Sequence, residues 1–252
     1  MKTQPKIPLK PLPEIKILLG ETIKFFREHF NLLISLSLIL IGIVLIFGFI
    51  LGVFGSSLSF ALLGNLVKQK ILFWIMMSIF AVLGISLLII TLIFQILAQG
   101  TIILAIIHKD KQHETGVKKI WHEIFSRAKS IIWVNILTFL AILGGYILLL
   151  IPGLIFSIWF NFSIFILLQE KLLGRAALKR SKALVKGYFW PLVFRIFILT
   201  LILFGASVCF SLVPFLGDLL GLAFSLFAVP FMYIYLYLIY KNLLKLKSET
   251  QN

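Results

Sequence analysis

The chain is a series of long apolar runs separated by short segments rich in lysine and arginine. Most runs reach about twenty residues, the length that an α-helix needs to cross roughly 30 Å of hydrocarbon. They do not alternate apolar and polar residues, as the strands of a membrane barrel do. The pattern therefore predicts an all-α integral membrane protein. Six runs can be marked, at 31–54, 71–108, 131–150, 153–168, 188–213 and 219–240.

The second run, 71–108, is the longest, and at 1.5 Å per residue it would measure about 55 Å. It fits either one long helix, straight or bent, or two short spans. The basic residues separate these alternatives, because lysine and arginine gather on the cytoplasmic side of a membrane. With a single second span, 21 of the 24 bases fall on one side, 2 fall on the other and Arg195 lies within a span. We therefore expect six spans with both termini in the cytoplasm, since seven spans would scatter the bases over both sides.

A basic amphipathic stretch precedes the first, third and fifth spans. In the second stretch, apolar residues recur at helical spacing, at Val117, Ile120, Trp121, Ile124, Phe125 and Ala128. In the third, bases form one stripe opposite Leu173, Ala177 and Leu184. The architecture expected is three units, each an interfacial helix followed by a transmembrane hairpin. Residues 1–30 would form a cytoplasmic tail with the first interfacial helix, 31–240 the six-span domain, and 241–252 a cytoplasmic tail.

Composition agrees with a bilayer environment and narrows the chemistry. Hydrophobic residues make up 61% of the chain, charged residues only 13%, and the mean hydropathy is +1.10, whereas soluble domains carry about a quarter charged residues. The net charge of +15 is confined to the segments between runs and comes without a nucleic-acid-binding motif, so we expect no nucleic-acid partner. The single cysteine excludes a disulfide within the chain, and the spacing of His108, His113 and His122 matches no metal site. No metal and no cofactor are expected.

The segment from Leu148 to Phe194 carries a motif, LLLIPGLIFSIWFNFSIFILLQEKLLGRAALKRSKALVKGYFWPLVF. Its features are an Ile-Pro-Gly turn at residues 151–153, Glu170 closing a span, and the ordered small and basic residues from Gly174 to Gly187. In these features the chain resembles the membrane domain attached to some bacterial glycerophosphoryl diester phosphodiesterases, and related uncharacterised bacterial membrane proteins. The resemblance implies a polytopic bacterial membrane domain without catalytic residues to carry over. A helical bundle favours the cytoplasmic membrane over an outer membrane. The phosphodiesterase barrel has no counterpart here, because no soluble segment is long enough to form it.

The third basic stretch is the first candidate site. Its bases could hold the phosphate of a lipid headgroup at the membrane surface, or they could form a solvated helix face that ends at Gly187. The candidate headgroup-binding residues are Arg175, Lys179, Arg180, Lys182 and Lys186.

Polar residues inside the apolar runs form the second candidate site. Arg195 either extends its side chain to the cytoplasmic surface or pairs with amides inside the bundle. Asn135 and Asn161 either join helices by hydrogen bonds or line a wet cavity, and Glu170 either makes a structural ion pair or binds a headgroup or partner. The full set is Gln95, Gln99, Asn135, Asn161, Glu170 and Arg195.

Three classes of function remain after these observations. The first is a non-enzymatic membrane protein that binds anionic lipid, with a possible protein partner, in membrane or envelope homeostasis. The second is a small transporter or channel, which requires Arg195 and the intramembrane amides to share one cavity. An intramembrane enzyme ranks last, because the runs supply no acid or histidine facing a nucleophile and no catalytic motif occurs.

Overall fold

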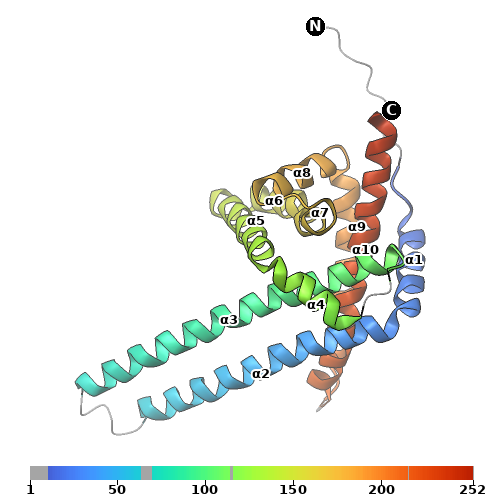
Figure 1. Ribbon diagram of the computed structural model, residues 1–252. Helices are drawn as coiled ribbons and strands as arrows, with labels where there is room; N and C mark the ends of the chain where they lie inside the picture. The colour runs from blue at the N-terminus through green and yellow to red at the C-terminus, as the bar shows by residue number, and fades with distance from the viewer. Residues whose placement is uncertain (1–10, 64–69, 114–115, 215, 252) are drawn as a thin grey trace.

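The computed structural model describes residues 11–63, 70–113, 116–214 and 216–251 (Figure 1). Throughout this described part the regular structure is α-helical, without strands. The helices are α1 (Ile15–Glu28), α2 (Phe30–Leu63), α3 (Lys70–Asp110), α4 (Val117–Ser126), α5 (Ala128–Leu148), α6 (Leu150–Phe160), α7 (Ser163–Glu170), α8 (Arg175–Val185), α9 (Phe189–Ser211) and α10 (Gly217–Gln251).

Six segments of the described chain are long and apolar enough to cross a bilayer. They are Phe30–Ile50, Ser78–Asp110, Ala128–Leu148, Leu150–Glu170, Phe189–Ser211 and Gly217–Glu249. This number and the all-α class agree with the prediction. The protein is therefore a polytopic membrane protein of the helical kind.

The second run forms one helix, α3, of 41 residues. It packs against α2, and together they extend well away from the other helices (Figure 1). Large apolar side chains such as Phe49, Ile79 and Val82 are exposed along this pair. An apolar surface of this kind is suited to lipid rather than to water.

The fourth segment is interrupted. Helix α6 ends at Phe160 and α7 begins at Ser163, with Asn161 and Phe162 between them. The turn expected at Pro152 and Gly153 lies earlier, at Leu149, whose backbone is extended. Pro152 stands in the first turn of α6, where its missing N–H would have had no partner within the helix.

Gly153 is required by the close approach of α5 and α6. A Cβ atom added at Gly153 would lie 2.4 Å from the ring of Tyr146, and one added at Gly145 would lie 2.9 Å from the Cα of Gly153. Only glycine at both positions lets the two helices pack at this distance.

Short helices α1, α4 and α8 precede α2, α5 and α9. Each buries an apolar stripe, through Leu18 in α1, Ile120 and Ile124 in α4, and Ala177 and Leu184 in α8. Two expected members of these stripes lie outside them, because Phe125 is 50% exposed and Leu173 is 60% exposed. Leu173 lies before α8 begins, whereas Phe125 lies within α4, one position further round the helix than the buried Ile124, and stacks on Trp121.

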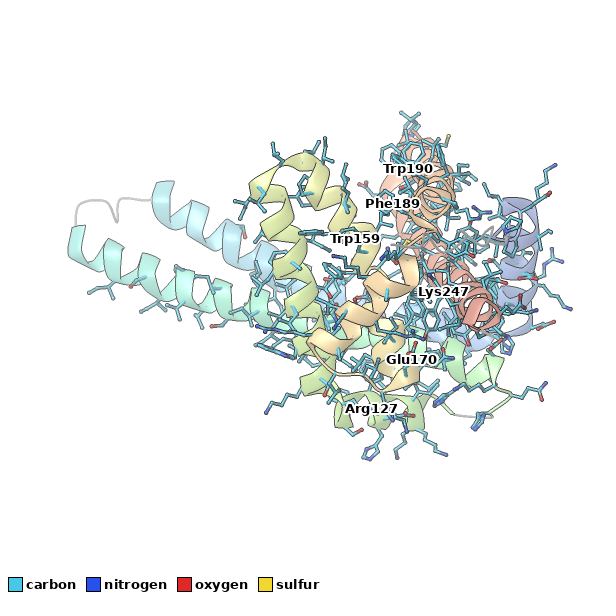
Figure 2. All side chains as sticks on the ribbon, turned by 90° about the horizontal axis from the view of Figure 1, so that it is seen from above. Arg127, Trp159, Glu170, Phe189, Trp190 and Lys247 are labelled. Carbon is cyan, nitrogen blue, oxygen red and sulfur yellow. The ribbon has the colours of Figure 1, made fainter. Side chains whose placement is uncertain are left out.

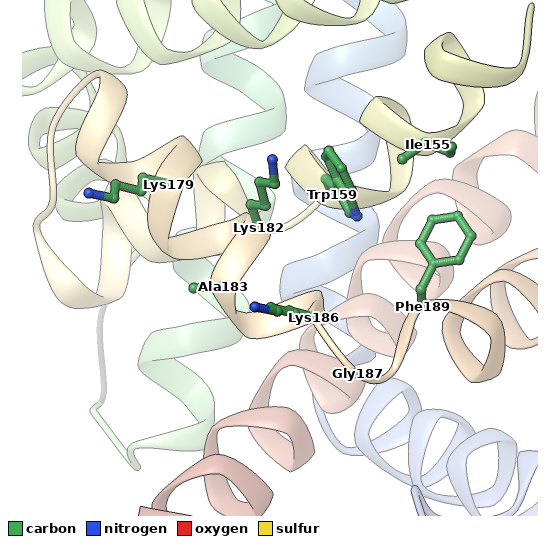
Figure 3. A pocket seen from close by; sticks show the side chains of 8 residues that line it. All are labelled: Ile155, Trp159, Lys179, Lys182, Ala183, Lys186, Gly187 and Phe189. Carbon is green, nitrogen blue, oxygen red and sulfur yellow. The ribbon is translucent and has the colours of Figure 1, made fainter. Parts of the chain in front are cut away.

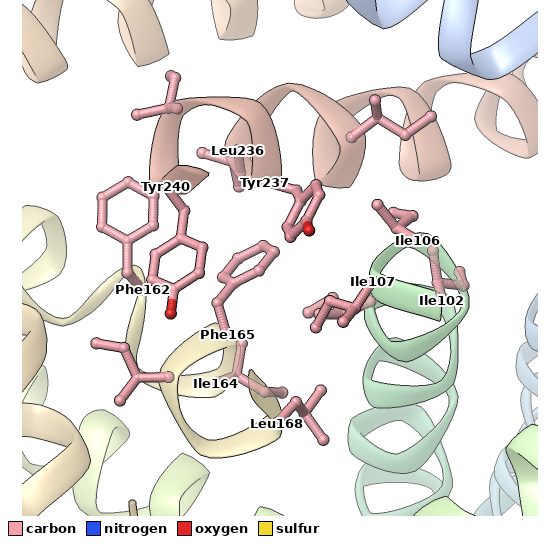
Figure 4. Packing of buried hydrophobic residues seen from close by; sticks show 14 of the residues in the cluster. Ile102, Ile106, Ile107, Phe162, Ile164, Phe165, Leu168, Leu236, Tyr237 and Tyr240 are labelled. Atoms are coloured by element: carbon pink, nitrogen blue, oxygen red, sulfur yellow. The ribbon is translucent and has the colours of Figure 1, made fainter. Parts of the chain in front are cut away.

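The core lies where the last turns of α3, all of α7 and the C-terminal half of α10 meet (Figure 4). Residues 162–168 are all buried, so α7 is surrounded on every side. The rings of Phe162 and Phe165 stack on Tyr240, with centroids 6.2 and 5.7 Å apart. Phe165 also stacks on Tyr237. Helix α10 continues to Gln251, so the expected C-terminal tail is helical there, whereas the first ten residues lie outside the described part.

Candidate functional site

Helix α8 presents the predicted bases on its exposed face. Ala177, Ser181 and Leu184 are buried against the bundle, whereas Lys179, Lys182 and the following Lys186 are exposed. The helix ends as the sequence predicts, because Gly187 adopts a positive φ of 95° just beyond the last turn.

Two side chains of α8 hold it against the end of α6. The buried hydroxyl of Ser181 donates a hydrogen bond of 2.6 Å to the backbone carbonyl of Trp159. The Lys182 ammonium lies 4.0 Å from the centroid of the Trp159 ring, a cation–π contact. Ser181 and Lys182 of α8 thus contact the backbone and the side chain of Trp159, respectively.

A pocket of about 670 Å³ opens beside this contact (Figure 3). We call it the headgroup pocket; its lining residues are Ile155, Trp159, Lys179, Lys182, Ala183, Lys186, Gly187 and Phe189. Figure 2 shows Trp159, Phe189 and Lys247 on the helices around it. Lys247 of α10 donates a hydrogen bond of 2.9 Å to the carbonyl of Lys186, which brings a further base to its edge.

The three lysines of the headgroup pocket have no carboxylate partner among the described residues. Glu170, the acid nearest in sequence, is engaged elsewhere. Its two oxygens accept hydrogen bonds from Arg180 Nε at 2.9 Å and from the Tyr240 hydroxyl at 3.0 Å. The structure therefore divides the predicted basic set: Arg180 makes a structural ion pair, Arg175 is exposed outside the pocket, and the three lysines line it.

Three lysine side chains line this mainly apolar pocket, Lys182 pointing toward Trp159 and Lys179 pointing away from it (Figure 3). Phosphate is an anion that lysine binds as a point charge, and tryptophan and phenylalanine accommodate acyl or glycerol carbons. The arrangement can therefore hold an amphiphile with an anionic head.

Arg195 lies apart from the predicted intramembrane amides. Its guanidinium donates hydrogen bonds to the carbonyl of Leu12 at 3.0 Å, to that of Pro13 at 2.9 Å and, within α9, to that of Pro191 at 3.0 Å. The side chain of Leu12 is itself buried. Arg195 thus fastens the segment that leads into α1 onto α9, a role that the sequence alone did not suggest.

Three of the predicted amides do meet. Gln99, Asn135 and Asn161 line a second cavity, of about 290 Å³, between α3, α5, α6, α7 and α10. Gln95 does not line it and is exposed. Sequence reasoning missed four other polar residues of this lining, Thr138, Ser157, Ser163 and Tyr233. The helical spacing of Thr138 from Asn135 and of Ser157 from Asn161 was the available signal.

Sequence reasoning also missed a second carboxylate that is bound by residues of α10. Asp110, at the end of α3, accepts hydrogen bonds from the Tyr237 hydroxyl at 2.9 Å and from Lys241 at 2.8 Å. Its partners stand 127 and 131 residues away, so no local pattern indicates them. Together with Glu170 and Tyr240, these contacts join α10 to both α3 and α7.

No known family model, no curated protein and no solved structure matches the chain. The resemblance to the phosphodiesterase-associated membrane domain stays a prediction.

Proposed function

We propose that this chain is a non-enzymatic protein of the bacterial cytoplasmic membrane that binds an anionic lipid in the headgroup pocket. The observation that carries the proposal is a set of three lysines, Lys179, Lys182 and Lys186, that have no carboxylate partner among the described residues. They line one pocket together with the apolar side chains of Trp159 and Phe189. An anionic headgroup supplies the charge that the described chain does not.

The expected strength of this interaction follows from the charge. A base near an anionic membrane surface contributes about 1 kcal/mol, so three bases contribute roughly 3 kcal/mol, or about a hundredfold in affinity. The apolar wall adds to this by covering lipid carbons. Such a site would retain its lipid through mild purification.

The proposal places α1, α4 and α8 at the cytoplasmic headgroup layer. The excess of lysine and arginine in the segments before Phe30, between α3 and α5 and between α7 and α9 supports that orientation, with both termini inside. The helical spans support the cytoplasmic membrane, because proteins of the outer membrane are β-barrels. The broader function that we propose is an accessory role in membrane or envelope homeostasis, exerted together with a protein partner.

The transporter alternative has partial support. Gln99, Asn135 and Asn161 share a cavity, but Arg195 is occupied by backbone carbonyls of the segment before α1. A transport site that depends on Arg195 together with these amides therefore has less support than lipid binding.

The proposal is tested by lipid retention. The full chain is purified from membranes in mild detergent, and bound anionic phospholipid is measured by native mass spectrometry for wild type and for the triple variant Lys179→Gln, Lys182→Gln, Lys186→Gln. The matched control is Lys16→Gln, Lys118→Gln, Lys119→Gln, which removes the same charge from exposed positions of α1 and α4.

We expect the pocket variant to lose most of its retained anionic lipid and the control variant to keep it. Equal retention in wild type and the pocket variant would refute the site. Equal loss in both variants would also refute it, because net charge rather than the pocket would then govern binding.

A further inference from the structure

The interruption between α6 and α7 is stabilised by its surroundings. It falls near the middle of the membrane-spanning segment Leu150–Glu170, at Asn161 and Phe162. Backbone groups that a broken helix leaves free must find partners within a bilayer. Here the Trp159 carbonyl accepts from Ser181 at 2.6 Å, and the Phe160 carbonyl accepts from Ser163 at 2.8 Å.

Irregular backbone at membrane depth occurs where it is buried in protein or lines a cavity. The break between α6 and α7 lines a cavity, because Phe160, Asn161 and Ser163 belong to the wall of the 290 Å³ cavity. The remaining wall comes from α3, α5 and α10, so four separated parts of the chain contribute to it. We call this the amide cavity.

The amide cavity is polar but uncharged. Its polar residues are Gln99, Asn135, Thr138, Ser157, Asn161, Ser163 and Tyr233, and no charged residue is among its lining residues in the described chain. An ionic ligand would lose its hydration here without a counter-charge. The lining therefore favours a neutral ligand.

Two side-chain oxygens of the amide cavity, one on Thr138 and one on Asn135, are available to a ligand. Thr138 Oγ1 is buried without a partner among the described residues. Asn135 uses Nδ2 to donate to the Ile131 carbonyl at 2.9 Å, which leaves its side-chain oxygen as an acceptor. Buried polar groups without partners are unfavourable, so a ligand that both donates and accepts would be stabilised here.

We infer that the amide cavity binds an uncharged ligand bearing hydroxyl groups, held between α5, the α6–α7 break and α10. Hydroxyls both donate and accept, which matches a wall made of amides and alcohols. The volume corresponds to about ten water molecules at roughly 30 Å³ each, which fits a small polyol or the glycerol end of a neutral lipid. This site is separate from the headgroup pocket in residues, charge and ligand class.

The experiment uses the full chain in lipid nanodiscs and two probes. A photoreactive diacylglycerol tests a lipid source, with crosslinks mapped by mass spectrometry. Radiolabelled glycerol, measured by scintillation proximity, tests a soluble source. The variants are Thr138→Val and Asn161→Leu, singly and together, and the control is Asn242→Leu, an amide outside the cavity.

Thr138→Val gives the sharpest test. Valine has nearly the shape of threonine, and the Thr138 hydroxyl has no partner to lose in the described chain. We expect an unchanged or raised melting temperature together with at least a tenfold loss of binding for one probe. Loss of diacylglycerol crosslinking at α5–α7 would identify a lipid ligand, and loss of glycerol binding a soluble one.

The inference is overturned if neither probe binds wild type above the double variant, or if binding persists in both single variants. The lysine variant of the headgroup pocket should bind the neutral probes normally. Loss of anionic lipid from the lysine variant would therefore say nothing against the amide cavity. Likewise, loss of neutral-probe binding in the Thr138 and Asn161 variants would say nothing against the headgroup pocket.

Discussion

At the residue scale, the tyrosines of α10 connect packing with charge. Tyr240 is fully buried, its ring stacks on Phe162 and Phe165, and its hydroxyl donates to Glu170. Arg180 completes the partners of that carboxylate. The carboxylate is thereby held at the end of α7, and it adds no negative charge to the headgroup pocket.

Replacing Tyr240 by phenylalanine keeps the ring and removes one hydrogen bond to a carboxylate. Loss of such a bond costs about 2 kcal/mol. We therefore expect a lower melting temperature in detergent, measured by intrinsic fluorescence. The control Tyr146→Phe, at an exposed hydroxyl, should melt like wild type. Identical melting of all three proteins would show that the bond to Glu170 contributes nothing to stability.

Gly153 provides a second test at this scale. Gly153→Ala places a methyl group against the Tyr146 ring, which must move, so we expect destabilisation by about 1–3 kcal/mol, typical of overpacking. Gly144→Ala, with no atom within 4 Å of its added Cβ, should be neutral or stabilising. Thermal melting of both variants measures the difference. If the two variants melted alike, the close approach of α5 and α6 would not depend on Gly153.

At the element scale, the helices follow from hydropathy and amphipathic spacing, whereas the interruptions do not. The runs predicted α3, and the bases of α8 with Gly187 predicted its exposed face and its end. The break at Asn161 was not predicted because its flanks are mostly apolar and because one stabilising partner, Ser181, lies 22 residues after Trp159, whose carbonyl it binds. The lysines of the headgroup pocket could be predicted because they follow the local spacing of one helix. The separation of Arg195 from the amides could not, because its partners, Leu12 and Pro13, lie more than 180 residues away in the sequence.

Arg195 links two elements, and its removal should release one of them. In Arg195→Gln the carbonyls of Leu12 and Pro13 lose their guanidinium partner. We expect faster hydrogen exchange and earlier proteolytic cleavage around residues 11–18, with α9 itself unaffected. Arg175→Gln, at an exposed base, is the matched control. Unchanged exchange in Arg195→Gln would show that α1 is held by its apolar stripe alone.

At the scale of the whole molecule, burial is concentrated where α3, α7 and α10 meet, and the α2–α3 pair extends from that core (Figures 1 and 4). Helix α2 has 34 residues, about 51 Å at 1.5 Å per residue, well beyond the roughly 30 Å of a hydrocarbon layer. The far end of this pair should therefore emerge from the bilayer, on the side opposite the headgroup pocket.

Cysteine labelling tests this emergence. In a Cys209→Ser background, Ser56→Cys lies 26 residues beyond Phe30, about 39 Å along α2, and Leu45→Cys lies about 22 Å along it. We expect a membrane-impermeant maleimide added to intact cells to label position 56 and not position 45. Failure to label either position would indicate that α2 is tilted enough to remain within the membrane.

The position of α10 in the chain also sets the order of biogenesis. Helix α10 contacts α1, α2, α3, α8 and α9, and it follows all of them in sequence, so the ribosome makes it after them. Until Tyr237 and Tyr240 have been synthesised, α7 and the end of α3 lack the contacts that α10 makes with them. Earlier helices can enter the bilayer as they emerge, but the core closes only after translation has passed Tyr240. A nascent chain stalled before that point would present Phe162 and Phe165 to insertion factors and to membrane proteases.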